Sequence, residues 1–233
     1  LGFDPINDME QLISILKKHQ NTIIPRSVFS HFVGSDSDNF DDFSAQQFSL
    51  FDKASKQLQA AFTHHILRHI DNSAGILHFP DRQLDMCRLG LGLYGINSRD
   101  NQIINNVCSL RTTILQMHKI GFNETVGYSR KGTVERETVV AAIPIGYADG
   151  LDRRLGNRNC YCLVNGHKAP YLGNICMDVA MIDVTDIPCK EGDSVEIFGD
   201  KLPVTVLSDT LGTIPYEILT SISERVKRVY FQD

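Results

Sequence analysis

Three tyrosines in the C-terminal half of the sequence stand in short motifs rich in glycine, proline and polar residues. They are Tyr128 in VGYS, Tyr147 in PIGYADG and Tyr216 in TIPYE. A phenol removes a proton from carbon only where a cation or cofactor stabilises its phenolate, because a free phenol is a weak base near neutral pH. A structural hydrogen bond is the commoner role of a single tyrosine. The motifs therefore suggest acid–base chemistry only as a set, together with NICMD at 174–178.

A second group of residues could bind an anion. NSAG at 72–75 is expected to end one strand, and CRLGLGLYG at 87–95 is expected to form the next. The hydroxyl of Ser73 and the backbone amides around Gly90 could hold a phosphate, since glycine lets the main chain approach a ligand closely. The alternative is that these glycines only relieve crowding in the wall of a barrel.

Arg88 lies within the otherwise apolar run 87–96. A guanidinium buried there needs a partner, because an unpaired buried charge is costly. That partner could be a structural carboxylate, or it could be a ring nitrogen or anionic group of a ligand. His69 lies in another run of low polarity, where a histidine more often belongs to the core.

The elements that must position these residues alternate in the first part of the chain. Helices are predicted at 9–16 and 44–62, where apolar residues recur at helical spacing. The apolar runs 27–35, 64–70 and 87–96 are predicted as strands buried on both faces. This alternation is typical of parallel strands beneath helices.

Beyond Ile96 the pattern changes to short strands separated by turns, and it returns to helical spacing only at 204–223. Asn165-Gly166 is predicted to form a hairpin turn. A complete (β/α)8 barrel needs about 250 residues, and only three of its strands are predicted here. We therefore expect the C-terminal part of a TIM barrel over residues 1–98, a mainly β domain over 99–233, and truncation of the barrel at its N-terminus.

The composition narrows the classes of partner. The 233 residues carry a net charge of −5, which disfavours a nucleic-acid-binding protein. No apolar run is long enough to span a membrane and the N-terminus lacks a signal core, so we expect a cytoplasmic protein that acts on a small molecule. The six cysteines show no zinc-site spacing, so no metal site is predicted.

Taken in order, the motifs resemble those of the alanine racemase family, and the resemblance covers essentially all 233 residues. It implies a pyridoxal 5'-phosphate-dependent isomerase that interconverts L- and D-alanine with two bases and supplies D-alanine for peptidoglycan. The markers are SHFVGSD, HIDNSAG, DMCRLGLGLYG, VGYS, PIGYADG, GNICMD and TIPYEILTSISERVKRVY.

The resemblance also implies roles for single residues. Tyr128 matches the base that removes the α-proton of the L-enantiomer. Arg88 matches the arginine at the pyridine nitrogen, and His69 matches the histidine that supports this arginine. The phosphate contacts fall on Ser73, the amides of Gly90 and Leu91, and the hydroxyl of Tyr216.

Two further positions match residues on the substrate side. The backbone amide of Met177 would meet the substrate carboxylate, and Tyr147 would line a narrow access passage. The family shares each site across a two-fold homodimer. Tyr128, Tyr147 and Met177 would then act in trans to residues of the partner that match Arg88, Ser73 and Tyr216.

The sequence departs from the family in one respect, because the lysine that carries the cofactor and serves as the D-side base has no counterpart. These residues alone are therefore expected to have negligible racemase activity. One alternative is a related racemase acting on another amino acid, such as serine, lysine or ornithine. The other is a non-catalytic dimerisation or interaction fragment. Retention of Tyr128, Arg88, Ser73 and Tyr216 together speaks against the fragment.

Overall fold

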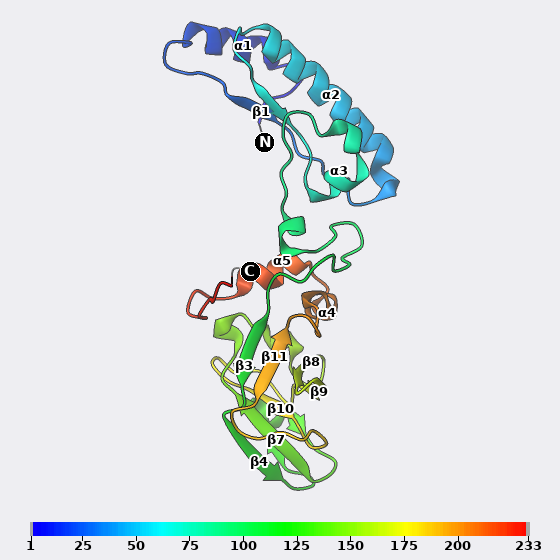
Figure 1. Cartoon of the computed structure of the whole chain (residues 1–233), viewed down its shortest axis with the longest axis vertical. Helices are drawn as coiled ribbons and strands as arrows, with labels where there is room; N and C mark the ends of the chain where they lie inside the picture. Colours follow the sequence, from blue (N-terminus) through cyan, green and yellow to red (C-terminus); the bar gives the residue numbers. More distant parts are fainter. Residues whose placement is uncertain (1, 232–233) are drawn as a thin grey trace. The chain divides into compact units, whose positions relative to one another are not determined.

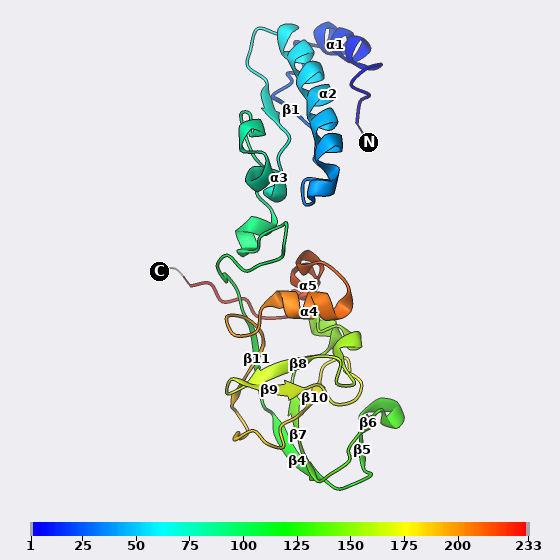
Figure 2. The same cartoon turned by 90° about the vertical axis from the view of Figure 1, so that its right-hand side faces the viewer.

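The computed structural model describes residues 2–231, and the chain divides into two compact units at Asn105 and Asn106 (Figures 1 and 2). Each unit has a hydrophobic core of its own.

The first unit contains helices packed beside a small parallel sheet, with the long helix α2 lying along strand β1 (Figures 1 and 2). The helices are α1 (Met9–Lys18), α2 (Asp41–Ala60) and α3 (Ser73–His78), and the strands are β1 (Ser27–Phe29) and β2 (Leu67–His69). Both helices predicted from apolar spacing are confirmed as α1 and α2. Their buried faces follow that spacing, with Met9 packing against Ala54, Leu58 and Ile66.

Two of the three predicted strands are present, but their predicted burial on both faces is wrong. The side chain of Phe29 in β1 is 63% exposed and that of Leu67 in β2 is 40% exposed. A parallel strand is buried on both faces only where neighbouring strands and helices cover it. Within the described residues this sheet contains β1 and β2 alone.

The third predicted strand, at 87–96, is a correction, because this segment is irregular and ends in a 3-10 helix at Leu91–Tyr94. Arg88 therefore does not lie in a strand. The segment approaches β2 through isolated backbone bonds, from the Asp85 amide to the Arg68 carbonyl (3.1 Å) and from the Arg88 amide to the Asp71 carbonyl (3.0 Å). These bonds are three residues apart, which does not match the two-residue repeat of a ladder.

The second unit is built of antiparallel sheets, which confirms the expected β architecture. Its sheets have the strand orders β10-β7-β4, β3-β11-β8-β9 and β5-β6. The strands are β3 (Leu110–Thr113), β4 (Gln116–Ile120), β5 (Thr125–Val126), β6 (Gly132–Thr133), β7 (Thr138–Ile143), β8 (Tyr161–Val164), β9 (His167–Pro170), β10 (Ala180–Asp183) and β11 (Ser194–Phe198). The helical tail is confirmed as α4 (Val204–Leu211) and α5 (Pro215–Ser221).

The predicted hairpin turn between β8 and β9 is also confirmed. Asn165 and Gly166 both have positive φ angles, 51° and 82°, as a two-residue turn of this type requires.

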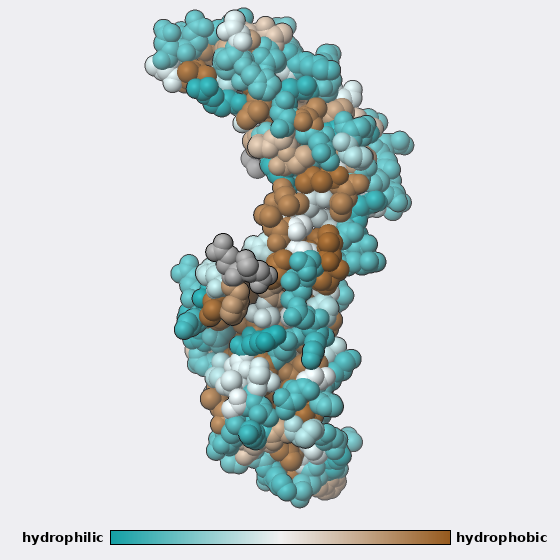
Figure 3. Space-filling view, viewed as in Figure 1, coloured by the Kyte–Doolittle hydropathy of each residue, from teal (hydrophilic) through white to brown (hydrophobic). Residues whose placement is uncertain are grey.

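On the face drawn in Figure 3, hydrophobic residues lie between hydrophilic ones on both units. Among residues 2–231, no helix is both long enough and apolar enough to cross a bilayer.

Candidate active site

Ser73 is positioned by the asparagine that joins β2 to α3. The Asn72 Oδ1 atom caps α3 by accepting from the Gly75 amide (2.9 Å), and it also accepts from the Ser35 hydroxyl (2.9 Å). The Asn72 side chain donates in turn to the carbonyl of Phe32 (3.1 Å). One capping residue thus fixes both the start of α3 and the loop after β1. Ser73 is the first residue of the helix and is 7% exposed.

The Ser73 hydroxyl lies against the glycine-rich segment. The amides of Gly90 and Gly92 donate to Ser73 Oγ at 2.8 and 3.4 Å. Leu91 follows directly, as the first residue of the 3-10 helix. The Gly90 amide therefore points at the serine, whose own O–H proton stays available to an anion.

Arg88 bridges the ends of the two strands. Its Nη2 atom donates to the carbonyls of Ser30, after β1, and Ile70, after β2, the latter at 2.9 Å. Its Nε atom is buried and has no hydrogen-bond partner among the described residues. Burial lowers the pKa of Arg88, and the charge of Asp71 partly opposes this. The hydrogen bonds of the Arg88 guanidinium within residues 2–231 go to backbone carbonyls and not to a carboxylate, so its Nε atom is left without a partner there.

His69 and Arg88 meet through an aromatic ring that the sequence did not single out. Phe29 lies opposite His69 in the β1–β2 register, and the two rings stack at 5.3 Å with an interplanar angle of 9°. The Arg88 guanidinium carbon lies 5.2 Å from the centroid of the same ring. No hydrogen bond between His69 and Arg88 occurs within the described residues. Support of Arg88 by His69 therefore stays a prediction, and Phe29 is the contact that joins them.

His31 is a further residue near Arg88 that the sequence left without a role. It follows β1 in the motif SHF, and burial together with the positive charge of Arg88 lowers its pKa. The pKa of His69 is lowered for the same two reasons. Two histidines that are easily kept neutral therefore lie near the guanidinium.

Asp71 is a fully buried carboxyl beside this group, and neither of its oxygens has a hydrogen-bond partner among the described residues. Burial raises the pKa of Asp71 to about 6, although the charges of Arg82 and Arg88 act in the opposite direction. The folded protein therefore binds this proton more tightly than the unfolded chain. Stability from this group is fully present below about pH 4 and is lost as the pH rises through about 6.

This gives a prediction for Asp71→Asn, which removes the charge but keeps the shape. At about pH 8 the variant should be more stable than the wild type by about 3 kcal/mol, because each pKa unit corresponds to about 1.4 kcal/mol. The difference should vanish at about pH 4, where both side chains are neutral. Urea unfolding at the two pH values measures it, and a variant less stable than the wild type at the higher pH would contradict it.

In the second unit, Tyr128 lies between β5 and β6 with its side chain 72% exposed. Gly127 before it has a φ of 77°, and Ser129 and Arg130 after it have φ angles of 59° and 52°. Gly127, Tyr128 and Cys176 line a hollow of about 320 Å³. This hollow is shallow and largely open to solvent, so the phenol lies exposed at the surface and is not packed into the core.

Tyr147 and Met177 are brought together by pairing of their two loops. The Tyr147 amide donates to the Cys176 carbonyl (3.0 Å), and the Ala148 amide donates to the Met177 carbonyl (3.0 Å). Both side chains are about half exposed. Within residues 2–231 the backbone amide of Met177 donates to no backbone carbonyl, which leaves this amide available to a carboxylate.

Gly146 permits this close pairing, because a Cβ atom added there would collide with the carbonyl oxygens of Cys176 and Met177. Gly146→Ala should therefore push the Tyr147 loop away from Met177 and lower the free energy of unfolding by about 2 kcal/mol. Gly121→Ala is the matched control, since its Cβ atom would make only an ordinary contact with Glu124. Equal thermal stability of the two variants would contradict the prediction.

Tyr216 is the second residue of α5, and its carbonyl accepts from the Thr220 hydroxyl at 2.7 Å. It belongs to the second unit, together with Tyr128, Tyr147 and Met177. Its predicted contact with a phosphate stays a prediction.

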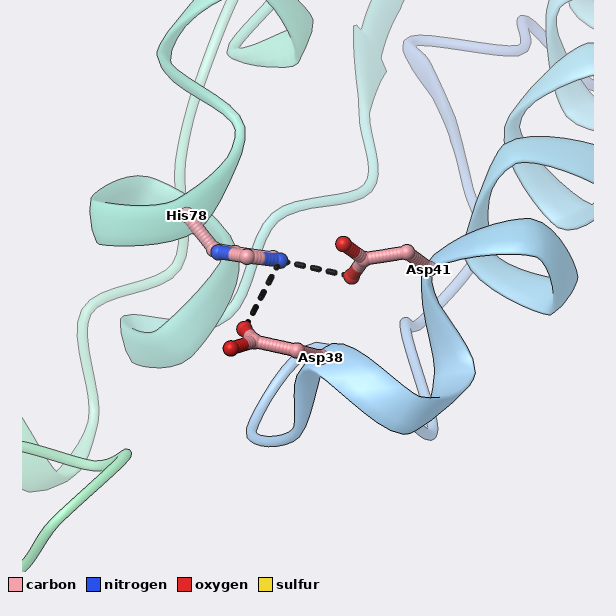
Figure 4. Close-up of side chains that lie close together, drawn as sticks. All are labelled: Asp38, Asp41 and His78. Carbon is pink, nitrogen blue, oxygen red and sulfur yellow. Dashed lines mark hydrogen bonds and ion pairs between the residues drawn. The ribbon is translucent and has the colours of Figure 1, made fainter.

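A separate polar cluster in the first unit consists of Asp38, Asp41 and His78 (Figure 4). The His78 Nε2 atom lies 2.6 Å from Asp41 Oδ1 and 3.7 Å from Asp38 Oδ1. Their spacing would suit a metal ion, but Arg99 forms an ion pair with Asp38 and already supplies a cation there. We assign the cluster to an ion-pair network that ties α3 to the start of α2. The expectation of no metal site stays a prediction.

Comparison with known proteins identifies both parts of the chain. Residues 1–98 match the family model of the alanine racemase N-terminal domain, and residues 107–230 match that of the C-terminal domain. Alanine racemase 1 of Clostridium acetobutylicum is 35% identical over 100% of this chain and 62% of the relative. Alanine racemase of Helicobacter pylori is 36% identical over 99% of this chain and 64% of the relative.

Solved structures agree with these matches. Alanine racemase from Bartonella henselae with covalently bound pyridoxal phosphate superimposes with a TM-score of 0.85 at 31% identity, covering 99% of this chain and 63% of that one. Alanine racemase of Clostridium difficile 630 gives a TM-score of 0.89 at 31% identity, covering 98% of this chain and 61% of that one.

The chain spans about 62% of the length of the curated relatives it matches. Its first unit is part of a TIM barrel and its second unit is a mainly β domain. Because the two family models together match nearly the whole sequence, the chain belongs to the alanine racemase family.

Proposed function

We propose that the protein carrying this chain is a pyridoxal 5'-phosphate-dependent alanine racemase that supplies D-alanine for peptidoglycan. The observation that carries the proposal is the exposed phenol of Tyr128 at the hollow that it lines with Gly127 and Cys176. A tyrosine kept only for a structural hydrogen bond is usually packed with its hydroxyl paired.

The residues of the first unit fit the cofactor. The buried Nε atom of Arg88 lacks a partner among residues 2–231, as expected of a donor that faces a ligand nitrogen. The Ser73 hydroxyl lies among the Gly90 and Gly92 amides and can donate to a phosphate oxygen. When bound, pyridoxal phosphate delocalises the negative charge left at the α-carbon after its proton is removed.

The side chains have separate tasks in the reaction. Arg88 would hold the cofactor by donating to its pyridine nitrogen, and it would leave that nitrogen unprotonated because a guanidinium does not readily release its proton. Tyr128 removes the α-proton on the face used for the L-enantiomer. The D-side base is the cofactor lysine, for which these 233 residues show no counterpart. The Met177 amide holds the substrate carboxylate, and Tyr147 lines the access passage.

We further propose a homodimer in which each site takes residues from both subunits. Tyr128, Tyr147 and Met177 of this chain act with residues of the partner that match Arg88, Ser73 and Tyr216. The domain boundary near Ser98 and a cytoplasmic location are retained as predictions from the sequence.

The test is to incubate the full-length protein and pyridoxal phosphate with L-alanine or D-alanine and to follow both enantiomers by chiral chromatography. Each enantiomer should yield the other until the two are equal. Serine, lysine and ornithine are assayed in parallel, and a higher kcat/KM for one of them would favour the related racemase. Absence of any interconversion, despite bound cofactor, would leave the non-catalytic interaction fragment as the better description.

A further inference from the structure

The backbone around Tyr128 adopts a conformation that needs external support. Ser129 and Arg130 both lie in the left-handed region, with φ angles of 59° and 52°. Such angles are unfavourable for residues that carry a Cβ atom and persist only where the surroundings impose them. The short strands β5 and β6 on either side contribute only two residues each.

Asn174 supplies that support through its side chain. Its Nδ2 atom donates to the backbone carbonyl of Tyr128 at 3.0 Å, and the side chain is 8% exposed. Its Oδ1 atom accepts from Asn157 Nδ2, also at 3.0 Å. Because Asn157 occupies the oxygen, the amide has one preferred orientation, with its NH2 group directed at Tyr128.

The position of Asn174 is itself fixed by close backbone packing. Gly173, which precedes it, has a φ of 72°, and the Gly173 carbonyl accepts from the backbone N–H of Asn157 at 2.8 Å. A Cβ atom added at Gly132, on the far side of the Tyr128 loop, would lie 2.9 Å from the Gly173 amide nitrogen. The two segments therefore meet without intervening side chains, so a small displacement of Asn174 passes directly to the Tyr128 loop.

The same segment also forms part of the hollow at the phenol. Two residues after Asn174, Cys176 lines this hollow together with Gly127 and Tyr128. The Cys176 carbonyl then pairs with the Tyr147 amide. Asn174 thus connects the backbone of Tyr128 with the segment that carries Cys176, another residue of the same hollow.

We propose that Asn174 is a positioning residue for Tyr128, because its side-chain amide holds the Tyr128 carbonyl and thereby sets the direction of the phenol. The inference rests on the proposed function, in which Tyr128 takes the α-proton from L-alanine and returns a proton to the same face of the α-carbon. It assigns to Asn174 an effect on that one proton transfer and not on the transfer at the opposite face.

The test uses Asn174→Ala and Asn174→Asp in the full-length holoenzyme. Aspartate keeps the shape of the side chain but places an oxygen against the Tyr128 carbonyl. Asn157→Ala frees the Asn174 amide to rotate without altering it. Asn159→Ala is the matched control, because its exposed side chain donates to the Arg154 carbonyl and does not contact the Tyr128 loop. We measure kcat/KM and the α-deuterium isotope effect with each enantiomer of alanine.

Both Asn174 variants should lose about tenfold in kcat/KM, since a misplaced base loses its near-attack geometry. The isotope effect should rise with α-deuterated L-alanine, because transfer to Tyr128 becomes more rate-limiting, and should fall with α-deuterated D-alanine. Asn157→Ala should change both isotope effects in the same directions by a smaller amount, and Asn159→Ala should change neither.

A loss of activity with unchanged isotope effects would overturn the inference, because a purely structural role lowers the amount of working enzyme and leaves the chemistry intact. Unchanged kcat/KM in the Asn174 variants would overturn it as well. If Asn174→Ala does not fold, the isotope effects of Asn157→Ala decide. If Tyr128→Phe racemises alanine at the wild-type rate, the proposed function fails. If Tyr128→Phe loses activity but the Asn174 variants keep the wild-type kcat/KM and isotope effects, the role of Asn174 is wrong while the proposed function stands.

Discussion

Tyr128→Phe should lower kcat/KM for alanine racemisation by between about 10²- and 10⁴-fold, the range typical of removing a general base. Phenylalanine fills the same space but has no oxygen to take up a proton. The side chain is 72% exposed, so its hydroxyl contributes little to the core and the fold should be unaffected. Circular dichroism at a wavelength that reports alanine inversion follows the reaction in both directions.

The matched control is Tyr161→Phe, which removes a phenol from β8 of the same unit. The Tyr161 ring lies 4.4 Å from the Lys168 ammonium and forms no part of the candidate site. Its kcat/KM should equal that of the wild type. Comparable losses in the two variants would show that the effect of Tyr128→Phe is not specific to proton transfer.

Arg88→Lys should lower kcat/KM by between about 10- and 100-fold, as small displacements at a reacting centre do. One ammonium cannot bridge the carbonyls of Ser30 and Ile70 and also face a ring nitrogen, as the guanidinium fork can. An ammonium also releases its proton more readily than a guanidinium. Protonation of the pyridine nitrogen would favour transamination, so the variant should form more pyruvate for each racemised alanine.

Arg82→Lys provides the comparison, because Arg82 is another partly buried arginine of the first unit. Its guanidinium carbon lies 4.2 Å from the Phe79 ring centroid. Among the described residues the side chain that donates to the carbonyls of Ser30 and Ile70 is that of Arg88 and not that of Arg82. We expect some loss of stability and an unchanged ratio of pyruvate to racemised alanine. Wild-type kcat/KM and pyruvate formation in Arg88→Lys would contradict the role assigned to Arg88.

Local signals in the sequence predict most elements of the fold. The apolar stripe of α1 and the Asn165-Gly166 turn depend on residues within a few positions of each other, and both are confirmed. The segment 87–96 shows where such signals fail. Its apolar composition favours a strand, but a strand forms only where a partner continues the ladder. Here the backbone bonds to β2 and to the residues just after it are three residues apart along the segment, whereas a ladder repeats every two residues.

The same distinction applies to the candidate site. Ser73 and Arg88 could be chosen from the sequence, because a serine beside glycines and a charge in an apolar run are unusual on their own. Phe29 and Asn174 could not. Phe29 matters because the β1–β2 register places it opposite His69, and Asn174 reaches Tyr128 across 46 positions of the chain. An aromatic residue in a strand and an asparagine in a loop are otherwise ordinary.

We propose that Tyr128 removes the α-proton of L-alanine and not that of D-alanine, and exchange of the α-proton with solvent distinguishes the two. The Tyr128→Phe holoenzyme is incubated in ²H₂O with D-alanine or L-alanine, and NMR follows loss of the α-proton signal. D-alanine should exchange its α-proton while remaining D-alanine, and L-alanine should exchange far more slowly than with the wild type. Rapid exchange of L-alanine by the variant would contradict the claim.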